Sequence, residues 1–229
     1  MRKYQRFLPW PGKLSTKQES RVSEKIHQRF LAISEAISDE LYQALKQVGV
    51  VKLSSREYIA GRKASLPEML YRSVIGQQIS SKAADSIWQR LLDQAGNTPL
   101  IDYIHGNNGE TLRACGASGA KAKTLMAITQ AFKSKQLETE HLKTLNRKER
   151  SNALTSLWGI GPWTADMASL FYFLDPDIWP EKDIAAVNTL QGLIGDGKNA
   201  NEIATLFTPH RSYLALKMWR ISDGYSKDI

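Results

Sequence analysis

The chain has 229 residues, a formal net charge of +8 and 42% hydrophobic residues, enough for one substantial domain or two interlocked lobes. Its single cysteine, Cys115, excludes an internal disulfide and a four-cysteine iron–sulfur cluster, which fits a reducing compartment. The longest apolar runs are too short to span a membrane, and the N-terminus lacks the apolar core of a secretory signal. We therefore expect no membrane partner.

Most of the positive charge lies near the N-terminus. Residues 1–30 carry eight basic side chains against Glu19 and Glu24, a net of +6 that leaves +2 for the rest of the chain. Basic clusters attract phosphate in a salt-dependent way. We expect residues 1–35 to form a basic N-terminal arm, which either adds nonspecific attraction to nucleic acid or is a solvated and partly mobile tail.

Periodicity and capping residues predict helices along the remaining chain. Ser38 caps a helix that ends at about Val48, before Gly49, and Leu66-Pro67-Glu68 opens another. The other predicted helices cover residues 83–91, 100–105, 109–115, 120–133, 148–158, 163–174, 184–193 and 211–225. Because no segment shows sustained strand alternation, the sequence predicts an all-α fold.

Two connections between predicted helices contain candidate functional residues. Residues 76–81, Gly-Gln-Gln-Ile-Ser-Ser, are either a plain helix-to-helix turn or a contact surface. At Gly159-Ile160-Gly161 the chain makes a tight turn, and Pro162 suits the first position of the next helix. The first backbone amides of that helix could bind a phosphate oxygen, although Gly-x-Gly-Pro is also a common connector.

The segment 157–183 carries a family resemblance. Leu-x-Gly-Ile-Gly is followed by Trp-Thr-Ala-Asp, and Asp183 lies twenty positions after Trp163. This pattern resembles the helix-hairpin-helix DNA glycosylases, and most closely the 3-methyladenine DNA glycosylase II group, over roughly Leu66 to the C-terminus. The resemblance implies a two-lobed helical glycosylase domain over residues 36–229. A central lobe of about 66–183 and a second lobe of 36–65 plus 184–229 would have the active cleft between them.

By this resemblance Asp183 is the catalytic residue. As a bare residue before an apolar helix it is most simply an N-cap, and the two roles can coexist. A helix N-terminus favours the ionised carboxylate, which would stabilise the oxocarbenium-like sugar and orient or deprotonate water. The other acidic residues of this loop, Asp175, Asp177 and Glu181, lack the matching position.

The resemblance also implies a lesion pocket. Trp163 stands where bifunctional members carry the lysine that forms a Schiff base, so we expect no strand cleavage by that route. Electron-rich aromatic rings attract cationic alkylated bases. Met167 replaces a tyrosine of the family, which puts the shape of the pocket in doubt. The predicted pocket residues are Trp163, Trp219, Met167, Phe171 and Tyr172.

The same resemblance implies contacts with DNA and with a cation. Gln78 would fill the gap left by a flipped base, with Gln77 as the alternative. The predicted DNA-binding residues are Gln78, Gln77, Ser80, Ser81, Gly159, Gly161 and Thr164. The backbone carbonyls of Thr155, Leu157 and Gly159 would hold a structural sodium or potassium ion; no other cofactor is required, and an iron–sulfur cluster is not expected.

The sequence therefore predicts a monofunctional glycosylase that excises alkylated purines of the 3-methyladenine and 7-methylguanine type in base-excision repair. Its partner would be double-stranded DNA containing damaged bases, and we expect a monomer. The protein would be cytoplasmic in a bacterium or nuclear in a eukaryote. Two alternatives remain open: a glycosylase of the same fold for uracil or hypoxanthine, and a DNA-structure binding protein without catalysis.

Overall fold

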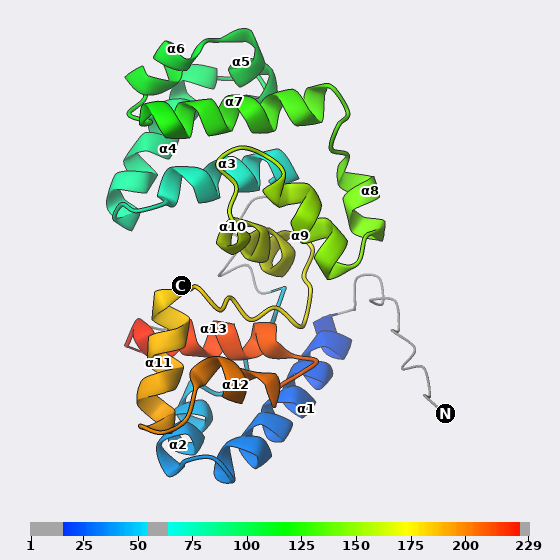
Figure 1. The fold of residues 1–229 in the computed structure, drawn as a ribbon, viewed down its shortest axis with the longest axis vertical. Coiled ribbons are helices and arrows are strands. Elements are labelled where there is room, and N and C mark those ends of the chain that lie inside the picture. The colour runs from blue at the N-terminus through cyan, green and yellow to red at the C-terminus, as the bar shows by residue number, and fades with distance from the viewer. Residues whose placement is uncertain (1–15, 55–63, 225–229) are drawn as a thin grey trace. The chain divides into compact units, whose positions relative to one another are not determined.

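The computed structural model describes residues 16–54 and 64–224, and over these residues every regular element is helical. The predicted all-α fold is confirmed there (Figure 1). The chain forms two compact units: unit 1 combines Met1–Ala60 with Leu174–Ile229, and unit 2 is Gly61–Phe173. None of the described helices is long and apolar enough to cross a membrane.

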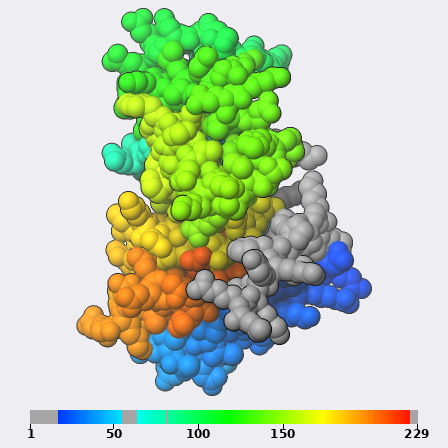
Figure 2. Space-filling model, turned by 45° about the vertical axis from the view of Figure 1, so that its right-hand side comes forward, coloured from blue at the N-terminus to red at the C-terminus, as the bar shows by residue number. Residues whose placement is uncertain are grey.

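Unit 1 is built from helices that lie far apart in the sequence. In chain order they are α1 (Thr16–Glu35), α2 (Asp39–Val48), α11 (Ile184–Ile194), α12 (Ala200–Thr205) and α13 (Arg211–Ser222). Helix α2 packs against α1, α11 and α13, so the first and the last described helices share one core. In Figure 2 the light-blue surface of residues near 40 adjoins the orange surface of residues near 200.

The prediction of a basic arm is wrong for residues 16–35, because these residues form helix α1 of unit 1. Phe30 of this helix is fully buried and packs edge-to-face on Phe207, with ring centroids 4.8 Å apart. Arg29 donates to the carbonyl oxygen of Thr208 at 2.7 Å. Lys17, Arg21 and Lys25 remain exposed on α1, and the basic residues of positions 1–15 lie outside the described residues.

Unit 2 contains the two motifs. Its elements are α3 (Leu66–Gly76), α4 (Ser81–Ala95), α5 (Leu100–Gly106), α6 (Gly109–Ala114), α7 (Gly119–Lys133), α8 (Thr139–Thr144), α9 (Arg147–Thr155), α10 (Pro162–Met167) and a π-helix (Ala168–Tyr172) that continues α10. Ser65 and Glu68 form a capping box at α3, and Asn146 with Glu149 forms one at α9. Leu70, Leu125 and Leu154 are fully buried in the core of this unit.

The boundary between the units differs from the expected one at residue 183. The segment 174–183 belongs to unit 1, because side chains of α13 hold it. Arg211 binds Asp177 through two parallel hydrogen bonds, Nε to Oδ1 at 2.7 Å and NH2 to Oδ2 at 2.8 Å. Asp183 is therefore attached to the unit formed by the chain ends.

Candidate active site

Asp183 begins α11 as its N-cap, with extended backbone angles. Its Oδ1 accepts the amide of Ala186 at 2.8 Å and the indole Nε1–H of Trp219 at 2.9 Å. Trp219 comes from α13, so two helices determine where this carboxylate points. A carboxylate that is held by an N-cap bond and an indole N–H can stabilise a developing positive charge without reorganising.

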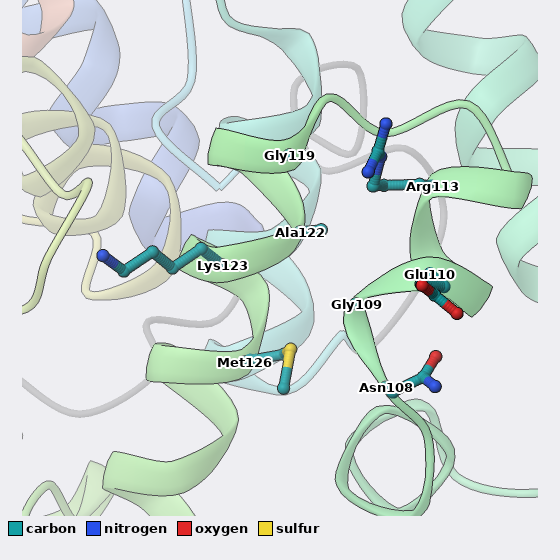
Figure 3. Close-up of a pocket in the computed structure, with 8 residues that line it drawn as sticks. All are labelled: Asn108, Gly109, Glu110, Arg113, Gly119, Ala122, Lys123 and Met126. Carbon is teal, nitrogen blue, oxygen red and sulfur yellow. The ribbon is translucent and has the colours of Figure 1, made fainter.

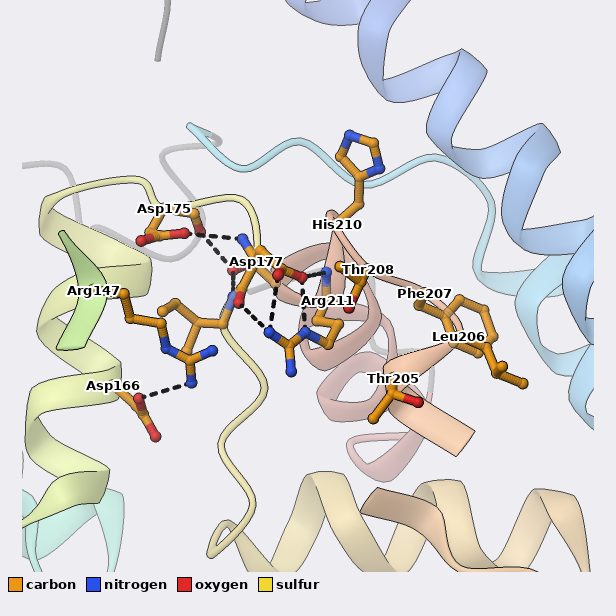
Figure 4. A network of polar contacts seen from close by, with 12 residues as sticks. Arg147, Asp166, Asp175, Asp177, Thr205, Leu206, Phe207, Thr208, His210 and Arg211 are labelled. Atoms are coloured by element: carbon orange, nitrogen blue, oxygen red, sulfur yellow. Dashed lines mark hydrogen bonds and ion pairs between the residues drawn. The ribbon is translucent and has the colours of Figure 1, made fainter. Parts of the chain in front are cut away.

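Two neighbouring acidic residues, Asp175 and Asp177, hold the loop instead, Asp177 through its carboxylate and Asp175 through its backbone carbonyl. Asp177 accepts from Arg211, and this hydrogen bond raises the pKa of the Arg211 guanidinium (Figure 4). The carbonyl of Asp175 accepts from Ser212 Oγ at 2.5 Å, and the Ser212 amide donates to the carbonyl of Pro176 at 3.0 Å. These bonds fasten the start of the loop to α13 and leave Asp183 at its end.

Trp219 has a role beyond the predicted one. The sequence predicts that its ring lines a pocket. In the structure its indole nitrogen also donates a hydrogen bond to the carboxylate of Asp183, the predicted catalytic residue. The sequence contains no signal for this bond, because the two residues are 36 positions apart and lie on different helices.

The helix-hairpin-helix motif lies in unit 2 as α9, a turn and α10. The Ile160 amide donates to the Leu157 carbonyl at 3.1 Å, which closes the turn. Gly159 has φ +82°, and a Cβ there would lie 2.0 Å from Thr124 Oγ1 of α7. Gly161 has φ −93°, and a Cβ there would meet nothing within 4 Å. The fold therefore requires glycine at position 159 and does not require it at position 161.

The predicted DNA-binding residues differ in how far their side chains are exposed. Gln78 is exposed and has φ +58°, and Ser80 is exposed and caps α4. Gln77 is half-buried, and its Nε2 donates to Thr164 Oγ1 at 3.0 Å. Thr164 is 1% exposed, so its side chain faces the protein; the predicted phosphate contact of its backbone amide at the start of α10 stays a prediction. Ser81 begins α4, and its side chain is not among those described.

The predicted pocket residues of unit 2 follow one another along α10 and the π-helix. Trp163 and Met167 are four residues apart in α10, which places them on one face. Met167 is only 5% exposed, so its side chain is mostly core. Phe171 and Tyr172 are half-buried within the π-helix, a helix type that is frequent at functional sites. A pocket role for Trp163, Phe171 and Tyr172 stays a prediction.

An exposed tryptophan also lies on the hairpin, and the sequence interpretation missed it. Trp158 is 49% exposed, and the Lys123 ammonium lies 4.3 Å from its ring centroid. Lys123 borders an open groove between α6 and α7, but its side chain extends away from Arg113 and Glu110 (Figure 3). None of the predicted site residues lines this groove.

Sequence relatives decide the family. The chain is 31% identical over 172 residues to DNA-3-methyladenine glycosylase 1 of Schizosaccharomyces pombe, covering 71% of this chain and 75% of that protein. The chain belongs to the helix-hairpin-helix 3-methyladenine DNA glycosylases. It is also 22% identical over 199 residues to the DNA-3-methyladenine glycosylase of Bacillus subtilis, covering 79% of this chain and 66% of that protein. No family model matches the chain.

Solved structures of glycosylases share the fold. The S. pombe 3-methyladenine DNA glycosylase in complex with abasic DNA matches with a TM-score of 0.74 and 26% identity, covering 90% of this chain and 98% of that one. A DNA-3-methyladenine glycosidase from Bacillus halodurans has a TM-score of 0.70 at 21% identity, with 87% and 90% covered. The fold of this glycosylase is therefore that of enzymes in the same family.

Proposed function

We propose that this glycosylase excises alkylated purines from double-stranded DNA in base-excision repair, by flipping the base and hydrolysing its N-glycosidic bond. The relationship to the S. pombe enzyme, whose name states 3-methyladenine as its substrate, carries the proposal. The solved complex of that enzyme with abasic DNA supports DNA as the partner.

Asp183 is the catalytic residue of the proposed reaction. Departure of the base leaves positive charge on the sugar, and a fixed carboxylate stabilises this charge electrostatically. The Ala186 amide and the Trp219 indole both orient the carboxylate through Oδ1. The same carboxylate orients or deprotonates the water that completes hydrolysis.

The described residues suit bases that leave without strong acid assistance. An N3- or N7-methylated purine is cationic, so its glycosidic bond is already weakened. Trp163 provides an electron-rich, half-buried ring, and such rings attract cations. Because Trp163 replaces the Schiff-base lysine of bifunctional members, the product is an intact strand with an abasic site.

The hairpin of unit 2 binds the DNA backbone in this proposal, and Gln78 enters the space that the flipped base leaves. The carbonyls of Thr155, Leu157 and Gly159 are the donor type that suits a monovalent cation. Leu157 O accepts one amide, and a carbonyl oxygen has a second lone pair for an ion. We propose sodium or potassium there, as a structural ion.

Single-turnover rates on matched duplexes test the proposed function. We expect release of N3-methyladenine and N7-methylguanine to be faster than release of hypoxanthine, uracil or 8-oxoguanine, because neutral bases need protonation to depart. Denaturing gels of the same reactions, run with and without alkali, should show nicks only after alkali. Faster release of uracil or 8-oxoguanine than of N7-methylguanine would contradict the alkylpurine assignment and favour a glycosylase of the same fold that removes a different base.

A further inference from the structure

The turn that carries Gln78 is held from two sides by side chains to which the proposed function gives no role. Lys121 of α7 donates through Nζ to the carbonyl oxygens of Ile75 and Gln77, each at 2.8 Å. Thr164 of α10 accepts a hydrogen bond from the side chain of Gln77 at 3.0 Å. Gln77 is thus fixed through its main chain and its side chain, one residue before Gln78.

The two bonds from Lys121 complete the C-terminal end of α3. The last carbonyls of a helix have no partner within it and carry the negative end of the helix dipole. An ammonium group has three donors and a positive charge, so a single Lys121 side chain satisfies two of these carbonyls. Burial lowers the pKa of Lys121, which is half-buried between α7 and the end of α3.

Gln78 itself has a strained backbone. Its φ of +58° lies in the left-handed region, which residues other than glycine occupy at a cost. Such a residue persists only where its surroundings hold it. The bonds of Lys121 and Thr164 to the preceding residue supply that restraint, and the result is a Gln77 that faces inward and a Gln78 that is exposed.

One of these bonds, between Gln77 and Thr164, joins the two elements of unit 2 to which the proposed function assigns contacts with DNA. Thr164 lies in the first turn of α10, directly after the hairpin, and α10 packs against α3. A shift of the hairpin helix would therefore act on the turn through the hydrogen bond between Gln77 and Thr164.

We propose that Lys121 and Thr164 are positioning residues that hold Gln78 ready to enter the duplex when the damaged base leaves it. The inference rests on the proposed function, in which Gln78 fills the gap. It assigns Gln77 to the support of the turn and Gln78 to the DNA.

Two substitutions test this inference. Lys121→Met keeps the length of the side chain without its donors, and Thr164→Val keeps the shape without the hydroxyl. Each is measured in single turnover on N7-methylguanine opposite cytosine and on the same lesion opposite an abasic site. We expect each substitution to slow excision from the paired duplex by about tenfold, which corresponds to about 1.4 kcal/mol and is the size of a lost hydrogen bond. On the duplex without an opposite base, where little has to be displaced, the excision rate should change less than about twofold.

Three controls separate positioning from general damage. Thr164→Ser, which restores a hydroxyl, should recover most of the paired-duplex rate. Lys133→Met removes an exposed ammonium from the far end of α7 and should leave both rates unchanged. Combining Lys121→Met with Gln78→Ala should be no slower on the paired duplex than Gln78→Ala alone, because residues that act through one another are not additive.

Each result decides between positioning and another role. Equal slowing on both duplexes, or additive losses in the double variant, would overturn the positioning role and leave Lys121 as a residue of the core. Should Lys121→Met fail to fold, as a thermal melt would show, the Thr164→Val and Thr164→Ser pair carries the same comparison. If the wild-type protein releases the base from neither duplex, the proposed function fails, and the positioning role fails with it.

Discussion

At the scale of single residues, Asp183 is the residue on which the chemistry depends. Asp183→Asn keeps an oxygen that can accept from Ala186 and Trp219, so the fold should survive. The substitution removes the charge that stabilises the sugar cation. We expect the single-turnover excision rate to fall by ~10² or more, with lesion-DNA binding unchanged or tighter. Rates and affinities on one methylpurine duplex measure both effects.

The matched control is Glu181→Gln, which removes an exposed carboxylate two residues away. It should leave the excision rate within about twofold, since exposed charges contribute little at this distance. An Asp183→Asn protein that keeps more than roughly a tenth of the wild-type rate would show that another group stabilises the transition state.

Single residues also show which features of the site could be predicted from the sequence and which could not. The position of Asp183 as an N-cap followed from the apolar helix after it, and the structure confirms the cap. The donors around the functional residues did not follow. Trp219 reaches Asp183 from another helix, and Lys121 reaches Gln77 from 44 positions away. Such bonds depend on packing between helices, about which local residue patterns carry no information.

At the scale of elements, the hairpin turn offers a comparison of two glycines. Gly159→Ala would place a methyl group 2.0 Å from Thr124 Oγ1 in a left-handed backbone. We expect the free energy of unfolding to fall by roughly 2–4 kcal/mol, from backbone strain together with overpacking. Denaturant unfolding, followed by circular dichroism, measures this loss.

Gly161→Ala provides the matched case, because its φ is −93° and no atom lies within 4 Å of the added Cβ. Its free energy of unfolding should fall by no more than about 1 kcal/mol, because Gly161 is the N-cap of α10 and alanine caps a helix less well than glycine. A lower DNA affinity for this variant would then report on the interface alone. Equal destabilisation by the two substitutions would contradict the separate roles of these glycines.

Most helices with strong caps were predictable, whereas α1, α8 and α12 were not, and α1 shows the physical reason most clearly. Helix α1 was missed because its buried face includes Ser23, His27 and Ser34 beside Ile26 and Phe30. These positions have helical spacing, but only two of the five are apolar, so the hydrophobic pattern is weak. The net charge of the segment indicated an arm, whereas long-range packing on residues such as Phe207 makes it a helix of the core.

At the scale of the whole molecule, one buried lysine links stability to pH. Lys217 of α13 is 1% exposed, and its ammonium lies 3.1 Å from His27 Nδ1 and donates to the Gly49 carbonyl. It thereby joins α13 to α1 and to the end of α2, which bring both ends of the chain into unit 1. Burial, aided by the charge of Arg220 and opposed by Glu24, lowers the pKa of Lys217 to about 7.

The sign of the pH dependence follows from this pKa. Lys217 has its ordinary pKa of 10.5 in the unfolded chain, so between about pH 7 and 10.5 the unfolded state binds more protons. The free energy of unfolding should therefore rise with pH in this window, by on the order of 2 kcal/mol between pH 7 and 9. Burial and the charge of Lys217 also lower the pKa of His27, which adds a rise of the same sign near pH 6.

Urea unfolding of the wild type and of Lys217→Met at pH 6, 7, 8 and 9 measures this contribution. The variant also loses the hydrogen bond to Gly49, so its free energy of unfolding at one pH differs from that of the wild type for two reasons. The change of the free energy of unfolding with pH is therefore the quantity to compare. We expect the rise between pH 7 and 9 to be present in the wild type and mostly absent in Lys217→Met. Lys25→Met, which removes an exposed ammonium from α1, should keep the wild-type slope. A Lys217→Met protein with the wild-type slope would mean that Lys217 stays protonated inside unit 1, with His27 and the Gly49 carbonyl sufficient to hold its charge.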